Sequence, residues 1–199
     1  CPHNPGYEEE KSKVMKNVIA TGILLAAAGV SSAGEISFSD SYGLATTNWN
    51  ENLSLTQFDS SLGTLASVLL EYNGQVDSSI AVESLDAAPS TVTGTSAADL
   101  TFGGPINDVL SISDSQSVDL SAFDGTIDFA GTSGFDFGTI TGVDSDSLLL
   151  TAPGDLAAFI GGGSVLINVD AAGLSSADGA GNLVAQIGTE AYAAITVTY

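Results

Sequence analysis

The residues of this chain that are best suited to chemistry are its acidic side chains, and the most suggestive spacing is Asp144-Ser145-Asp146. Proteins bind Ca²⁺ through oxygen atoms of carboxylates, main-chain carbonyls and water. The triplet is predicted to lie in a loop between two short strands, where alternating carboxylates can approach one ion. Asp155, after the next strand, is a third candidate ligand, although it also fits a helix N-cap. We therefore predict a Ca²⁺ site at Asp144 and Asp146, with solvated turn aspartates as the competing interpretation.

Carboxylate pairs are also the machinery of glycoside hydrolases, in which one acid has a raised pKa and the other acts as base or nucleophile. Asp124 with Asp128, or Asp136 with Asp144, can be written as such pairs. The chain has 24 acidic residues and only three of them precede residue 34, which leaves 21 in residues 34–199. Pairs of this kind therefore arise by chance, and we expect no enzyme and assign no catalytic residue.

Basic and sulfur-containing side chains are confined to the start of the chain. The three lysines are Lys11, Lys13 and Lys16, the histidine is His3 and the cysteine is Cys1. Beyond residue 16 nothing is available to neutralise phosphates, which excludes electrostatic binding of nucleic acid. The same composition excludes disulfides, Cys or His zinc sites and any mechanism that uses His, Cys or Lys after residue 16. A domain whose charges all have one sign is expected to be sensitive to ionic strength.

Residues 15–33 have the pattern of a secretory signal peptide. Met15 and Lys16 form a short basic start, residues 18–30 are apolar, and Ser31-Ser32-Ala33 supplies small residues for cleavage. A membrane-spanning helix needs about 20 apolar residues, so the apolar run is too short to be an anchor. The alternative is a buried N-terminal helix. We expect cleavage after Ala33, and we interpret residues 1–14 as an untranslated leader or an over-extended reading frame.

After residue 34 the pattern is typical of β-structure, with alternating apolar and polar residues separated by turn residues. Asn73-Gly74 predicts a tight hairpin turn. A single short helix is predicted near residues 154–160, with Asp155 as N-cap. The fold class is therefore all-β, an antiparallel two-sheet sandwich of jelly-roll or immunoglobulin-like type that forms one domain over residues 34–199. Residues 90–95 and 99–102 are expected to form one strand that is interrupted by an Ala-rich stretch. The other expected short strands are residues 35–40, 49–55, 67–73, 76–83, 109–113, 117–120, 126–130, 135–141, 147–151, 164–171, 184–187 and 192–199.

Four aromatic side chains are candidates for stacking on a carbohydrate, and their alternative role is packing in the core or across strands. They are Tyr42, Trp49, Tyr72 and Tyr192.

Three segments resemble the choice-of-anchor E domain family. Residues 57–65 contain Phe-Asp-Ser-Ser-Leu-Gly-Thr-Leu, which resembles the early motif of that family. Residues 151–161 are similar to its helical segment, and residues 179–183 together with 195–199 resemble its closing strands. The order and spacing of these segments cover essentially all of residues 34–199. It implies a bacterial protein exported to the cell surface, usually with a C-terminal sorting tail of the PEP-CTERM type, and it brings no catalytic residue.

Two features depart from the family pattern. Ser60 stands where proline is common, which is expected only to loosen a turn. After Tyr199 there is no Pro-Glu-Pro motif, apolar span or basic tail, so we expect either a truncated coding sequence, which we favour, or a released protein. Contact with a membrane is then expected only through an anchor that this chain does not contain.

The sequence therefore predicts an acidic, secreted structural or adhesive protein of the cell surface or extracellular matrix. Its expected partners are extracellular polysaccharide or other surface proteins, and Ca²⁺ is the one cofactor for which the residues give a reason. The alternative function is an extracellular polysaccharide-binding module, and a carboxylate-based glycoside hydrolase is a more distant one.

Overall fold

The computed structural model describes residues 34–199. The predicted leader and signal peptide, residues 1–33, lie outside the described residues. Among the residues that are described, no helix is long and apolar enough to cross a membrane.

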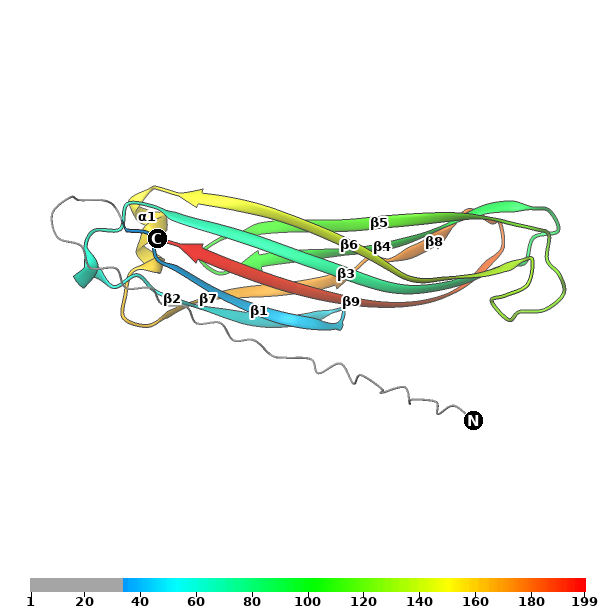
Figure 1. Ribbon diagram of the computed structural model, residues 1–199, viewed down its shortest axis with the longest axis horizontal. Coiled ribbons are helices and arrows are strands. Elements are labelled where there is room, and N and C mark those ends of the chain that lie inside the picture. Colours follow the sequence, from blue (N-terminus) through cyan, green and yellow to red (C-terminus); the bar gives the residue numbers. More distant parts are fainter. Residues whose placement is uncertain (1–33) are drawn as a thin grey trace, which may run out of the picture. The chain divides into compact units, whose positions relative to one another are not determined.

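Nine strands form two antiparallel sheets that pack face to face, which confirms the predicted all-β sandwich (Figure 1). The sheet that we call the β3 sheet has the order β1 (Ser37–Thr46), β9 (Leu183–Thr198), β3 (Val68–Ser84) and β6 (Gly134–Leu150). The opposing β4 sheet has the order β2 (Trp49–Thr56), β7 (Ser164–Gly173), β4 (Ser90–Gly103) and β5 (Asp108–Leu120), and the short β8 (Ser176–Asp178) also pairs with β4.

Strict alternation of side chains explains why these segments are strands. In β3 the even-numbered residues from Val68 to Val82 are buried, and most of the odd-numbered ones reach solvent. In β9 the pattern is reversed, so that Ala191, Ala193, Ile195 and Val197 face the core. Successive side chains of a strand point to opposite faces of the sheet, so each sheet contributes one apolar face to the space between them.

The predicted hairpin at Asn73-Gly74 is wrong, because β3 runs straight through both residues. Gly74 faces the opposing sheet at a point of close packing. A Cβ placed there would overlap Leu100 Cδ1 and would lie 2.6 Å from Ile112 Cδ1. The glycine is therefore needed for close approach of the two sheets, and its neighbour Asn73 simply lies on the outer face.

Several other predicted strands were too short. The strands predicted over residues 109–113 and 117–120 are one continuous strand, β5, and those over 135–141 and 147–151 are one continuous strand, β6. The strand predicted over 90–95 and 99–102 is β4, which runs without the expected interruption. The Ser and Asp residues between the predicted segments of β5 and β6 occupy exposed positions of edge strands, where polar side chains do not end a strand. In the central strand β4 the intervening Ser96 and Ala98 are fully buried between the sheets. Residues 126–130, predicted as a strand, belong instead to the loop between β5 and β6.

The predicted helix is present at one end of the sandwich, where it covers the ends of the strands (Figure 1). It consists of α1 (Pro153–Leu156) followed by the 3₁₀ turn η2 (Ala157–Phe159). Asp155 is not its N-cap, because the helix starts two residues earlier, with Ala152 at the cap and Pro153 in the first turn. Leu156 and Phe159 are buried, so the helix docks on the core.

A second 3₁₀ turn, η1 (Ser60–Leu62), lies in the first segment of the family resemblance. Asp59 caps it by accepting a hydrogen bond of 2.8 Å from the Ser61 amide, so Ser60 does not prevent an ordered turn at this point.

Candidate functional site

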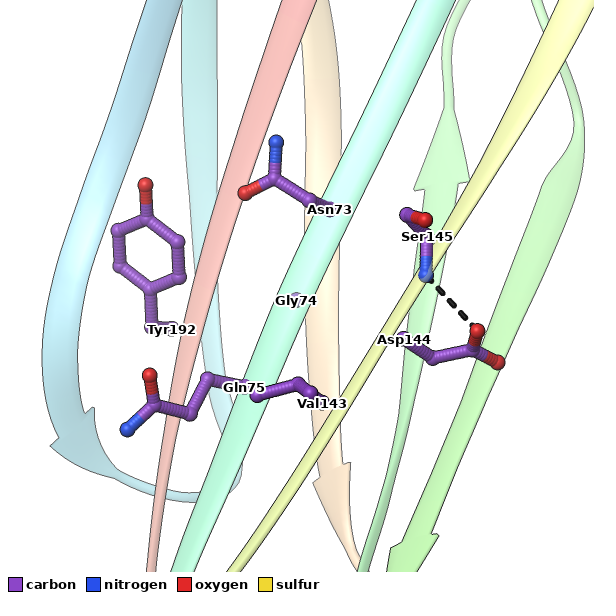
Figure 2. A pocket seen from close by; sticks show the side chains of 7 residues that line it. All are labelled: Asn73, Gly74, Gln75, Val143, Asp144, Ser145 and Tyr192. Atoms are coloured by element: carbon purple, nitrogen blue, oxygen red, sulfur yellow. Dashed lines mark hydrogen bonds between the residues drawn. The ribbon is translucent and has the colours of Figure 1, made fainter.

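An open depression on the outer face of the β3 sheet brings together polar and aromatic side chains from three neighbouring strands (Figure 2). The strands are β9, β3 and β6, and the depression lies near the middle of the two longest strands of the domain. Its lining consists of Asn73, Gly74, Gln75, Val143, Asp144, Ser145 and Tyr192.

The strand register aligns the side chains of this depression in a row. Gln75 is directly opposite Tyr192 of β9 on one side and directly opposite Val143 of β6 on the other. Residues directly opposite each other in neighbouring strands project to the same face of a sheet. With about 4.8 Å between strands, the row Tyr192–Gln75–Val143 extends about 10 Å across the outer face. Asn73 and Ser145 form the adjacent row on the same face.

Hydrogen bonding orients one of the two amides. Gln75 Nε2 donates to Asp77 Oδ1 at 3.0 Å, and Gln75 Oε1 accepts no hydrogen bond from residues 34–199. Asn73 is exposed, and its amide offers both donors and an acceptor to a ligand. The Asp144 carboxylate accepts a hydrogen bond of 2.8 Å from the Ser145 amide and extends away from Tyr192 (Figure 2). The depression therefore combines an aromatic face with amides that can bind hydroxyl groups.

Of the four aromatic residues proposed for carbohydrate stacking, Tyr192 is the one that lines this depression. Tyr72 is excluded, because it occupies an inward position of β3 and only 2% of its surface is exposed. Trp49 and Tyr42 are half-buried and pack on each other with ring centroids 4.7 Å apart, against the edge of the main core cluster.

Asp144 and Asp146 do not lie in a loop, as predicted, but at alternate positions within β6. They therefore share one side of an edge strand. Asp144 is six residues from the end of β6 at Leu150, about 20 Å along the strand. The structure therefore does not bring Asp155, beyond that end, to the other two carboxylates. Within residues 34–199 no group of three or more acidic side chains is arranged to hold a metal ion.

The two pairs of aspartates considered for glycoside hydrolysis lack the necessary arrangement. Asp136 and Asp144 are eight residues apart on β6, about 26 Å along the strand, whereas hydrolase carboxylates lie about 5–9.5 Å apart. Asp124 and Asp128 both accept hydrogen bonds from main-chain amides of the loop between β5 and β6. Their geometry is that of turn-forming aspartates.

Folding changes the ionisation of Asp124. Its carboxylate accepts hydrogen bonds from the amides of Thr126 at 3.1 Å and Thr132 at 3.3 Å. These bonds, that from Thr126 first, lower the pKa of Asp124 below its usual value. A general acid needs a raised pKa, so Asp124 is suited to holding a loop and not to protonating a leaving group.

The lowered pKa of Asp124 predicts a pH-dependent contribution to stability. A carboxyl group whose pKa is depressed by folding stabilises the native state above its unfolded pKa of about 3.9. That contribution is lost as the pH falls through the folded pKa. We expect Asp124→Asn to be less stable than the wild type at pH 7, and we expect the difference to shrink as the pH falls through the lowered pKa of Asp124. Urea unfolding midpoints from pH 7 to pH 2.5 measure this, and a constant difference across the range contradicts it.

No protein-family model, curated protein or solved structure matches this chain. The fold and the arrangement of side chains define it as an all-β sandwich with an open, polar and aromatic depression on one sheet.

Proposed function

We propose that this chain is an exported, non-catalytic structural or adhesive protein that contacts extracellular polysaccharide through the outer face of its β3 sheet. The observation that carries the proposal is the row Tyr192–Gln75–Val143, with Asn73 and Ser145 beside it. The signal-peptide pattern of residues 15–33 and the resemblance to the choice-of-anchor E family support export and a role at the cell surface.

The chemistry of the depression favours a sugar chain over a compact ligand. A sugar ring has an apolar face that can lie on the Tyr192 ring, and its hydroxyl groups can pair with the amides of Asn73 and Gln75. The depression is open and lies on a long strand surface, so a polymer can continue past it in both directions. An extended ligand on an exposed sheet needs no enclosed pocket.

The negative charge around the depression favours some classes of polysaccharide over others. Asp77 lies next to Gln75, Glu71 lies next to Asn73, and Glu190 precedes Tyr192 on the same face. No Lys, Arg or His occurs after residue 16 to pair with an anionic sugar. Polymers of uronic acids are therefore repelled at low ionic strength, and we expect neutral or amino-sugar polysaccharides to bind better.

The test is binding of the purified protein to a glycan array, followed by affinity electrophoresis of the glycans that bind. Tyr192→Ala is expected to weaken binding at least tenfold, which corresponds to about 1.4 kcal/mol. Tyr192→Phe keeps the ring and is expected to retain most of the affinity. Gln75→Ala is expected to weaken binding as well, because it removes the acceptor at the centre of the row.

Gln186→Ala is the matched control for Gln75→Ala. Gln186 lies on the same outer face, in a second depression formed by β3, β6 and β9 whose lining includes no aromatic residue. Gln186→Ala is expected to leave the affinity for the glycan unchanged. Equal binding by the wild type and Tyr192→Ala contradicts the proposed surface, and the absence of any glycan binding favours a purely structural role.

A further inference from the structure

The first part of β9 is a sheet edge that has a neighbour on one side only. β1 ends at Thr46, which lies opposite Glu190, and the chain then turns into β2. β9 begins at Leu183, and within residues 34–199 the stretch before Thr189 pairs with β3 alone. Figure 1 shows β9 extending past the end of β1. We call residues 183–188 the open edge.

The main-chain groups of alternate residues point out of the open edge. At the end of β1, the Thr47 amide donates to the Thr189 carbonyl at 3.0 Å. In an antiparallel ladder the N–H and C=O of one residue point to the same side of its strand, and successive residues alternate. The ladder with β3 is regular from Leu183 onward, so Leu183, Ala185 and Ile187 direct both groups away from β3. These strong hydrogen-bonding groups are left to solvent or to another strand.

The inner face of the sandwich is also uncovered at the open edge. Odd-numbered residues of β9 face the other sheet, and those from 191 to 197 are fully buried there. Ala185 and Ile187 occupy equivalent inward positions, yet both are exposed, Ile187 to 40%. The reason is that β7 ends at Gly173 and only the short β8 continues that side of the β4 sheet. The open edge therefore presents apolar side chains together with unpaired main-chain groups.

The open edge differs from the four outer strands of the sandwich by its lack of charge. Charged side chains on an edge strand oppose its pairing with a second copy. Residues 183–189 contain no charged residue, whereas each outer strand carries at least one acid. These acids are Asp40 in β1, Glu51 in β2, Asp108, Asp114 and Asp119 in β5, and Asp136, Asp144 and Asp146 in β6. Two copies can therefore approach at the open edge without bringing carboxylates together, which the outer strands do not allow.

The sequence of the open edge is complementary to itself in an antiparallel pairing. When Ala185 of one copy lies opposite Ala185 of the other, Leu183 of each copy lies opposite Ile187 of the other. Each of these pairs then exchanges both of its N–H···O bonds. Opposite residues share a face, so Leu183, Ala185 and Ile187 of both copies form one continuous apolar strip, with the small alanines at its centre. On the outer face Val184 lies opposite Gln186, again without charge.

We propose that the open edge of β9 binds the open edge of a second copy of this chain, in antiparallel register about Ala185. The pairing has a two-fold axis and occupies the open edge of both copies, so it closes at a dimer and does not continue into a fibre. The two four-stranded β3 sheets become one continuous sheet. An interface of this length buries less than the roughly 1,200 Å² of stable complexes, so we expect a weak dimer with a Kd on the order of 10–100 µM.

The acidic residues that flank the open edge make the dimer sensitive to salt. In the proposed register Glu190 of each copy lies next to Ala180 of the other. Asp86 is at the same end of the paired segment, where its carboxylate accepts a hydrogen bond of 2.6 Å from the Gly181 amide. These carboxylates repel each other across the interface, and salt screens the repulsion. The dimer is therefore expected to be at least threefold weaker in 20 mM NaCl than in 0.5 M NaCl.

The dimer has a consequence for polysaccharide binding, and this consequence alone rests on the proposed function. The two-fold axis is perpendicular to the joined sheets, so both outer faces, with both Tyr192 rings, lie on the same side. Tyr192 is seven residues from Ala185, which separates the two rings by roughly 45 Å along the strands. A polysaccharide chain that spans this distance is held at two points and gains avidity.

The test is sedimentation velocity of the purified protein in 0.15 M NaCl, from about tenfold below to about tenfold above the expected Kd. The wild type is expected to change from monomer to dimer over this range. Ala185→Asp and Ala185→Lys each place two like charges at the axis, and each is expected to weaken dimerisation more than tenfold. An equal mixture of the two variants is expected to restore a dimer, because opposite charges then face each other. Ala185 is exposed in the monomer, so both variants are expected to fold.

Ser39→Asp is the matched control. It adds the same charge as Ala185→Asp at an exposed position of β1, in the same sheet but away from the open edge. It is expected to dimerise like the wild type.

Hydrogen exchange checks the register of the pairing. The amides of Leu183, Ala185 and Ile187 are expected to gain protection as the protein concentration rises. Those of Gln186 and Gly188 face β3 and are expected to be protected at every concentration. A wild type that stays monomeric, equal dimerisation by the wild type and the Ala185 variants, or a mixture of the two variants that stays monomeric overturns the proposal. Glycan binding by such a monomer would leave the proposed function intact, so the two proposals fail separately.

Discussion

Replacing Phe159 with aspartate is expected to lower the free energy of unfolding by more than about 4 kcal/mol. Phe159 is fully buried in the main core cluster, at the end of the sandwich that α1 and η2 close. Truncation of a buried phenylalanine alone costs about 3–5 kcal/mol. The added carboxylate must in addition lose its hydration or pull the helix away from the core.

The neighbouring residue provides the control for this prediction. Ala158 belongs to the same 3₁₀ turn but is exposed, so Ala158→Asp adds the same charge to the same segment without burying it. It is expected to change stability by less than about 0.5 kcal/mol. Urea unfolding followed by circular dichroism gives both values. Similar midpoints for the two variants would mean that the helix contributes nothing to the core.

The fold class could be predicted because side-chain alternation is a local property. The segment from Ala191 to Val197 places every second residue in the core, and this is visible in the sequence. Strand lengths could not be predicted in the same way. Asn73-Gly74 is a turn dipeptide in isolation, but here Gly74 is selected by close packing against Leu100 and Ile112 of the other sheet. That requirement arises from tertiary structure and leaves no local signal.

The candidate site was predicted only in part, for a related reason. Tyr192 was one of four aromatic candidates that the sequence did not distinguish. In the structure it alternates with the buried Ala191 and Ala193, which places its ring on the outer face. Its alignment with Gln75 and Val143 depends on the register of β3 with both neighbours, which alternation does not specify. The error at Asp144 and Asp146 followed from the misplaced ends of β6.

Glu83, near the end of β3, departs from the alternation of buried and exposed residues in that strand. Its position in β3 is on the outward side, yet its side chain is fully buried. The loop between β5 and β6 folds over it. Glu83 Oε2 accepts a hydrogen bond of 2.8 Å from the Phe129 amide, and Oε1 accepts one of 2.5 Å from the Ser133 hydroxyl group. A buried carboxyl group thus holds a loop that contains few apolar anchors.

Glu83→Ala is therefore expected to destabilise the protein by about 3 kcal/mol, because it removes the acceptor of the buried Ser133 hydroxyl and of the half-buried Phe129 amide, and an unpaired buried donor costs about 1–3 kcal/mol. Glu71→Ala is the control: Glu71 is exposed on the same strand, so its loss removes the same formal charge without disturbing the loop. That change is expected to be neutral or slightly stabilising, since it reduces repulsion among acids.

Urea unfolding measures the change in stability of both variants, and hydrogen exchange shows where each protein opens. In Glu83→Ala, protection is expected to be lost first at the amides of Phe129 and Gly134, the second of which donates to the Ala130 carbonyl. Equal stability of Glu83→Ala and Glu71→Ala, with unchanged exchange in residues 121–134, would show that the loop is held by its own turns and not by Glu83.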